Sequence, residues 1–171
     1  FNGEILLLSA SDDGHIIIWD WATRTPRHQL MISGGYVILS VTDDGQTLFA
    51  STSGVGEVKP TFILVDVASG EIVTTYQPAQ DDLALARMSG DGQYIVALYR
   101  DGTFISLDAS NGEEVFRTQL DSVSVTPGLD MILSADNHTA AINIGLQDII
   151  LIDITSGQSL GNVHAATSGI H

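Results

Sequence analysis

The chain has 171 residues, with 21 acidic and 6 basic side chains and a formal net charge of −15. Recognition of nucleic acids relies on basic patches, so this balance argues against a nucleic-acid partner. The absence of cysteine excludes disulfides, thiolate catalysis and cysteine-ligated zinc. A hydrophobic content of 44% suffices for a buried core, and no run approaches the roughly 20 apolar residues of a membrane span.

Short β-branched and aliphatic runs follow one another along the chain, separated by clusters of Gly, Asp, Asn and Ser. They show no helical periodicity, and many of the seventeen glycines stand where tight hairpins need them. The pattern predicts an all-β fold. The predicted strands, in chain order, are Ile5–Ser9, Ile16–Trp19, Tyr36–Val41, Thr47–Ser51, Phe62–Val67, Tyr94–Tyr99, Thr103–Leu107, Thr139–Ile144 and Ile149–Ile154.

A strand that ends in aspartate, followed by a polar turn and another strand, occurs four times. The aspartates are Asp20, Asp66, Asp108 and Asp153, and successive members are 46, 42 and 45 residues apart. A period of about 40–45 residues with four strands per unit is typical of a β-propeller blade. We name the strands of a unit a, b, c and d in chain order, so that strand c ends at this aspartate, the anchor aspartate.

The repeat predicts about four four-stranded antiparallel blades at residues 1–33, 34–78, 79–120 and 121–164, with 165–171 leading to a next blade or a closing strand. The first blade lacks strand a, because Phe1–Glu4 reads as the tail of a hairpin turn that leads directly into strand b. A blade cannot bury both of its faces alone. We therefore expect the chain to be part of a larger ring, completed by other blades of the same chain or by a second copy.

The segment Leu8–Asp20, with its Trp19-Asp20 dipeptide, resembles the consensus core of the WD-repeat (WD40-like) β-propeller family. The later copies keep the anchor aspartate but replace the tryptophan, and their turns are similar to quinoprotein and YVTN-type propeller repeats. The resemblance implies a non-catalytic scaffold for protein–protein interaction. It also implies structural roles for the four anchor aspartates and for Trp19, which would pack between neighbouring blades.

Two connections are longer than the repeat requires, residues 52–61 between strands b and c and residues 121–129 between strands d and a. In an up-and-down blade both kinds of connection emerge on the same face of the ring, which we call the loop face. Enlarged loops often mark a binding face, whereas neutral drift of surface loops is the alternative explanation. The candidate partner-binding residues on the loop face are Val55, Glu57, Lys59, Pro60, Ser122 and Ser124.

No catalytic, metal or cofactor site is predicted. The five histidines have no metal-ligand spacing, and nucleophile motifs such as Gly-x-Ser-x-Gly are absent. The acidic pairs Asp12–Asp13, Asp43–Asp44 and Asp81–Asp82 could offer oxygen ligands to calcium, although turn capping explains them better. We predict protein partners, no cofactor, no membrane insertion and a cytoplasmic location, with a secreted or cell-surface form left open. The alternative functions are a ligand- or peptide-sensing domain of a larger signalling protein and a quinone-dependent or hydrolytic enzyme.

Overall fold

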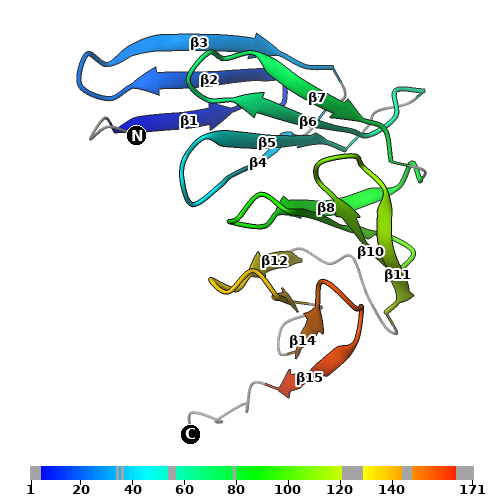
Figure 1. Ribbon diagram of the computed structural model, residues 1–171. Coiled ribbons are helices and arrows are strands. Elements are labelled where there is room, and N and C mark those ends of the chain that lie inside the picture. Colours follow the sequence, from blue (N-terminus) through cyan, green and yellow to red (C-terminus); the bar gives the residue numbers. More distant parts are fainter. Residues whose placement is uncertain are drawn as a thin grey trace, which may run out of the picture.

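The computed structural model describes residues 5–33, 35, 37–53, 57–78, 80–120, 129–143 and 148–164. These residues form fifteen strands and no helix, and consequently no helix that could cross a membrane. The strands make four antiparallel sheets, each built from consecutive strands. Figure 1 shows the sheets following one another along an arc, with the first and the last sheet at its two ends. The all-β prediction is confirmed.

The first sheet has three strands and the other three have four, so the expectation that the first blade lacks strand a is also confirmed. Blade 1 contains β1 (Leu6–Ala10), β2 (His15–Asp20) and β3 (Thr25–Met31). Blade 2 contains β4 (Val37–Val41), β5 (Thr47–Thr52), β6 (Thr61–Asp66) and β7 (Ile72–Tyr76). Blade 3 contains β8 (Leu83–Met88), β9 (Tyr94–Tyr99), β10 (Thr103–Asp108) and β11 (Glu114–Gln119). Blade 4 contains β12 (Asp130–Leu133), β13 (Thr139–Asn143), β14 (Asp148–Asp153) and β15 (Ser159–His164).

The space between successive blades is filled by apolar side chains from both sheets. The first strands β4, β8 and β12 lie beside one another along the arc. Alternate residues of the central strands point to opposite neighbours, because the side-chain period of a strand is two. The cluster between blades 1 and 2 includes Ile16, Ile18, Leu48, Ala50, Ile63 and Val65. The cluster between blades 2 and 3 includes Phe49, Phe62, Leu83, Ile95 and Tyr99. The cluster between blades 3 and 4 includes Val96, Leu98, Phe104, Met131, Ile142 and Ile152.

Each anchor aspartate caps the turn between strands c and d. The Asp66 carboxylate accepts the N–H of Ser69, three residues on, at 2.7 Å, and Asp20 and Asp153 accept the equivalent bond in their own turns. Asp108 accepts the N–H of Ser110, two residues on, at 2.7 Å. The fifth residue of the turn, counted from the aspartate, has a positive φ in every blade. It is Gly70, Gly112 and Gly157 in three blades, at 72–74°, and Arg24 in blade 1, at 58°. The repeated aspartate is therefore explained by turn chemistry.

The anchor aspartate of blade 4, Asp153, should make the stability of the fold depend on pH. Hydrogen bonds from Thr155 and Ser156 lower the pKa of Asp153 from 3.8 to about 2. A depressed folded-state pKa stabilises the fold above the unfolded-state pKa, and this stability is lost as the pH falls through the folded value. Asp153→Asn is therefore expected to cost about 1 kcal/mol of unfolding free energy near neutral pH.

The Asp153 difference should shrink as the pH falls from about 4 to about 2, because Asp153 becomes protonated in the unfolded chain near the upper value and in the folded protein only near the lower one. Urea unfolding of the two proteins at several pH values, followed by circular dichroism, measures it. An equal difference at pH 2 and pH 7 would contradict the capping role of the charged carboxylate.

Ring-shaped side chains on the outer strands join successive blades. His28, Tyr76 and Phe116 each lie against the positive-φ glycine of the next blade's turn, so closely that a Cβ there would come within 3.0 Å of the ring. The Tyr76 hydroxyl donates to the carbonyl of Ala109 in that turn at 2.9 Å, and the His28 Nε2 lies 2.9 Å from the carbonyl of Ala68. Glycine is thus required in these turns for both its φ and its missing side chain.

Candidate partner-binding surface

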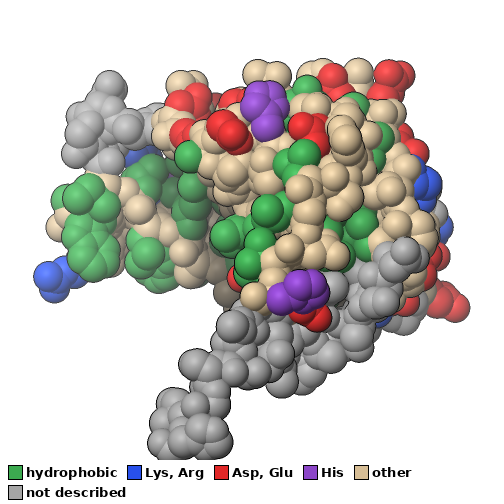
Figure 2. Space-filling view, turned by 90° about the horizontal axis from the view of Figure 1, so that it is seen from below, with side chains coloured by type: hydrophobic (Ala, Val, Ile, Leu, Met, Phe, Trp, Pro, Cys, Tyr) green, Lys and Arg blue, Asp and Glu red, His purple; other side chains and the backbone are tan. Residues whose placement is uncertain are grey.

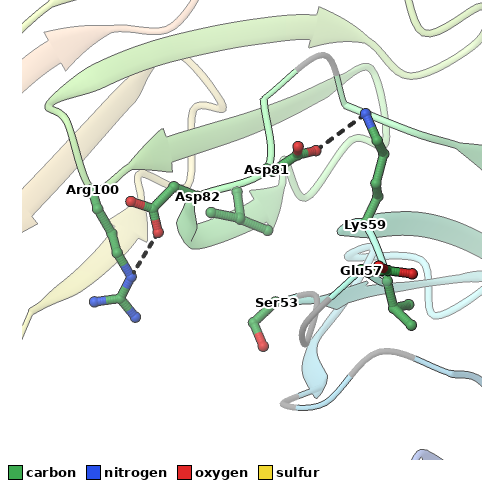
Figure 3. Close-up of a pocket in the computed structure, with 8 residues that line it drawn as sticks. Ser53, Glu57, Lys59, Asp81, Asp82 and Arg100 are labelled. Carbon is green, nitrogen blue, oxygen red and sulfur yellow. Dashed lines mark ion pairs between the residues drawn. The ribbon is translucent and has the colours of Figure 1, made fainter.

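Three connections from blades 2 and 3 meet on the loop face. They are the b–c loop between β5 and β6, the link from β7 to β8, and the b–c turn between β9 and β10. Together they border a pocket of about 360 Å³, shown in Figure 3, which we call the loop-face pocket. Its lining residues are Ser53, Glu57, Val58, Lys59, Asp81, Asp82, Leu83 and Arg100.

Two ion pairs hold the rim of the loop-face pocket. The Lys59 Nζ lies 3.3 Å from Asp81 Oδ1, and the Arg100 Nε lies 3.2 Å from Asp82 Oδ1. Figure 3 shows both pairs spanning different connections. All four side chains are more than half exposed, so solvent screening limits their contribution to stability. Their effect is to orient the loops, assisted by the Arg100 N–H, which donates to the Asp82 carbonyl at 2.9 Å.

The loop-face pocket has a surplus of negative charge. Three carboxylates line it, and the only cationic side chains among its lining residues are those of Lys59 and Arg100. Both cations are engaged with aspartates, whereas Glu57 forms no ion pair with any residue that the structure describes. A cationic group that enters the pocket would therefore find a carboxylate to pair with.

A second layer of polar contacts supports the link from β7 to β8. Gln80 donates to Asp101 Oδ2 at 3.1 Å, and Arg117 donates to Gln80 Oε1 at 2.9 Å. The N–H of Thr103 bonds to the Asp101 carboxylate and lowers the pKa of Asp101. Beneath them, burial raises the pKa of Tyr99 to about 12. The link from β7 to β8 is thus fixed to blade 3 through Gln80.

The structure brings two of the candidate loop residues to this pocket. Glu57 and Lys59 line it and are exposed, whereas Pro60 is buried and offers little surface to a partner. Val55, Ser122 and Ser124 lie outside the described residues.

The predicted structural residues lie on the blades themselves. The four anchor aspartates cap their turns between strands c and d. Trp19 is on the face of blade 1 that points away from blade 2, where its Nε1–H donates to Ser9 Oγ at 2.9 Å. No described residue of this chain packs there as a neighbouring blade.

The repeat pattern does not connect Asp81, Asp82 or Arg100 with the long b–c loop. It indicates the aspartate pair only as a candidate calcium ligand. In the described part of the chain no group of three or more His, Cys, Asp or Glu residues is placed to hold a metal ion. Arg100 directly precedes the Asp-Gly turn between strands b and c of blade 3. Because b–c connections emerge on the loop face, this position in the repeat indicates that Arg100 lies on the loop face.

A second cavity, of about 410 Å³, lies at the ends of the first strands β4, β8 and β12. Arg87 lines it and lies 3.4 Å from Asp130 on the neighbouring blade. The a–b turns beside it are joined by a hydrogen-bond ladder. The Asp43 N–H donates to the Gly90 carbonyl, and the Gly90 N–H donates to Asn137 Oδ1, both at 2.7 Å. A ligand-sensing function, the alternative to a scaffold, would use this cavity.

Comparison with solved structures identifies the architecture. The chain is similar to BamB from Moraxella catarrhalis, with a TM-score of 0.71 and 19% sequence identity, over 92% of this chain and 45% of that chain. It is similar to the Cps50 (Swd1) β-propeller domain of Myceliophteria thermophila, with a TM-score of 0.74 and 17% identity, over 94% of this chain and 52% of that chain. The chain has a β-propeller fold. It spans about half the length of both of these propellers.

The likeness to these propellers is a likeness of fold. No family model matches the sequence, and no curated protein matches it. The predicted architecture of consecutive antiparallel blades is confirmed, and the described residues form a partial propeller. What the propeller binds has to be argued from its own side chains.

Proposed function

We propose that this chain is a non-catalytic propeller scaffold that binds a basic segment of a partner protein at the loop-face pocket. The observation that carries the proposal is the pocket itself, built by three connections of two blades and rich in carboxylates. The charge of the whole chain, −15, adds a long-range attraction for cationic partners. A rigid frame of blades with preset loops suits binding, because little conformational entropy is lost when the partner docks.

The recognition would depend on the rim of the loop-face pocket. A lysine or arginine of the partner would pair with Glu57, while the Lys59–Asp81 and Arg100–Asp82 pairs hold the loops in position. Charges at an exposed rim act mainly on the association rate and on specificity, and they are sensitive to salt.

Reversing the Glu57 charge is expected to weaken binding of a basic peptide about fivefold to tenfold, a loss of about 1 kcal/mol. The probe is a fluorescein-labelled peptide of alternating Lys, Arg and Ser residues, and the measurement is fluorescence anisotropy at about 0.15 M salt, a physiological ionic strength. The matched control is Glu71→Lys, which makes the same change of net charge at an exposed position beside the c–d turn, on the opposite face.

Glu57→Lys and Glu71→Lys share every non-specific electrostatic effect, so their difference reports the site alone. Equal weakening by both variants would refute binding at the loop-face pocket and leave only a general attraction to an acidic surface. An acidic peptide of matched length that binds as tightly as the basic one would refute the proposed partner chemistry.

A further inference from the structure

The last strand of each blade, which we call its outer strand, has one edge that no described strand pairs with. The outer strands are β3, β7, β11 and β15. Such an edge presents a row of unpaired backbone N–H and C=O groups to any other strand, and proteins usually protect it with charged side chains or proline. Blade 2 has a neighbouring blade on each side, so the edge of β7 is open irrespective of what adjoins the first and last blades.

β7 lacks the features that protect the other three outer strands. β3 contains Pro26 and Arg27, β11 contains Glu114 and Arg117, and β15 contains Gly161. These residues oppose strand pairing by charge, by a missing donor or by weak strand propensity. β7 has the sequence Ile-Val-Thr-Thr-Tyr, with no charge, proline or glycine. All four outer strands have a bulge against their inner neighbour, so the difference lies in the side chains.

The side chains of β7 also favour the addition of a strand. All five are β-branched or aromatic, the residue types that are enriched in sheets. Ile72 is 49% exposed and Val73 is 65% exposed. A strand laid along this edge would cover part of their apolar surface and would also pair the open backbone groups.

Charge limits where two copies of this chain can approach each other. At a net charge of −15 the copies repel. Figure 2 shows acidic side chains over much of the face in view and few basic ones. β7 carries no charge, so two such strands can pair without placing like charges opposite each other.

The centre of β7 is complementary to itself. In an antiparallel pair of β7 strands centred on Thr74, Val73 of one copy lies opposite Thr75 of the other, and the two Thr74 residues face each other. Thr–Thr pairs across antiparallel strands are favourable, and β-branched side chains pack well on a pleated surface. Glu71, which precedes the strand, comes opposite the uncharged Gln77 of the other copy.

We propose that β7 pairs in antiparallel orientation with β7 of a second copy, which joins two four-stranded blades into one continuous sheet. The same strand serves both copies, so the contact is isologous and closes at a dimer. It uses the outer strand of blade 2 and not the loop face. It therefore stands or falls separately from the partner proposed for the loop-face pocket.

The first test is the mass of the 171-residue chain in solution, measured by sedimentation velocity over a wide range of concentration. The expected species is a dimer, with twice the chain mass of 18.2 kDa. Val73→Lys should raise the dimer dissociation constant more than about tenfold, because a lysine on an edge strand opposes pairing.

Val115→Lys is the matched control for Val73→Lys. Val115 occupies the same place in the bulge of β11 as Val73 does in the bulge of β7, and it is 43% exposed. Both variants make the same change of net charge. Val115→Lys should leave the dissociation constant nearly unchanged, so the difference between the variants reports the β7 edge alone.

The second test uses the absence of cysteine from the chain. Two residues directly opposite each other in antiparallel strands have Cβ atoms about 4.5–5.5 Å apart, close to the separation that a disulfide spans. With Thr74→Cys, mild oxidation by copper phenanthroline should therefore link two copies. Thr118→Cys, at a similarly half-buried threonine on β11, is the control and should give little or no covalent dimer.

A monomer at every concentration would overturn the proposal and leave the edge of β7 to a strand of a different protein. Oligomers that lengthen without limit would also overturn it, because an isologous contact closes at two copies. Equal effects of Val73→Lys and Val115→Lys, or equal cross-linking from positions 74 and 118, would show that β7 has no special part in association.

Discussion

Phe104→Ala is expected to lower the free energy of unfolding by about 3–5 kcal/mol, because its ring fills the junction between two blades. Phe104 is fully buried on β10, in the cluster between blades 3 and 4. Its ring lies 5.8 Å from that of Phe116, centroid to centroid. Truncation would leave a cavity between two sheets that are joined mainly through such apolar contacts.

Urea unfolding followed in parallel by circular dichroism and tryptophan fluorescence measures the Phe104 effect. Both tryptophans, Trp19 and Trp21, belong to blade 1, so fluorescence reports the end of the arc far from the substitution. Separate transitions in the two signals would show that blade 4 is released before blade 1 unfolds. Val115→Ala, at an exposed position on β11, is the control and should cost less than about 0.5 kcal/mol. A Phe104 effect as small as that of the control would contradict the packed interface.

Gly112→Ala is expected to cost about 2–3 kcal/mol, a large loss for the addition of one methyl group. Gly112 has a φ of 74°, which disfavours any side chain by about 1 kcal/mol. The added Cβ would also collide with the Tyr76 ring. Tyr76 would have to move, and its hydroxyl would lose the carbonyl of Ala109, worth about 1 kcal/mol.

The two causes at Gly112 can be separated by repeating Gly112→Ala in a Tyr76→Ala background, which removes every Tyr76 atom that the added Cβ would meet. The collision is absent there, so the cost should fall to the backbone part of about 1 kcal/mol. Thermal and urea unfolding of the four proteins complete the cycle. An equal cost in both backgrounds would rule out the contact between the outer strand and the next blade's turn.

The second and third strands of the blades could be predicted from the sequence because most of their side chains are at least partly buried. The inner strand β4 is predicted as well, whereas the inner strands β8 and β12 are not among the predicted strands. Strands such as Phe62–Val67 therefore appear as continuous apolar runs bounded by turn residues. The outer strands are not among those predicted from apolar runs. β3 contains Pro26 and charged or polar residues, which an edge strand tolerates, and β15 is exposed along its whole length. A continuous apolar run arises where both faces of a strand are buried, so an exposed outer strand shows no such run.

The residues of the loop-face pocket likewise include some that the sequence pattern indicates and some that it does not. Glu57 and Lys59 could be predicted because the b–c loop of blade 2 exceeds the repeat. Asp81 and Arg100 belong to connections of ordinary length. Their contribution depends on the packing of blade 3 beside blade 2, which fixes the ion pairs across the junction.

Binding of a basic partner at the loop-face pocket is tested most directly by photo-cross-linking from two exposed valines. Val58 lines the pocket, and Val115 lies on the outer strand of blade 3 and is exposed to a similar degree. With p-benzoylphenylalanine placed at one or the other position, irradiation with the labelled basic peptide should give an adduct from position 58 and little or none from position 115. Equal adducts from both positions, or an adduct from position 115 alone, would contradict the assignment of the binding surface.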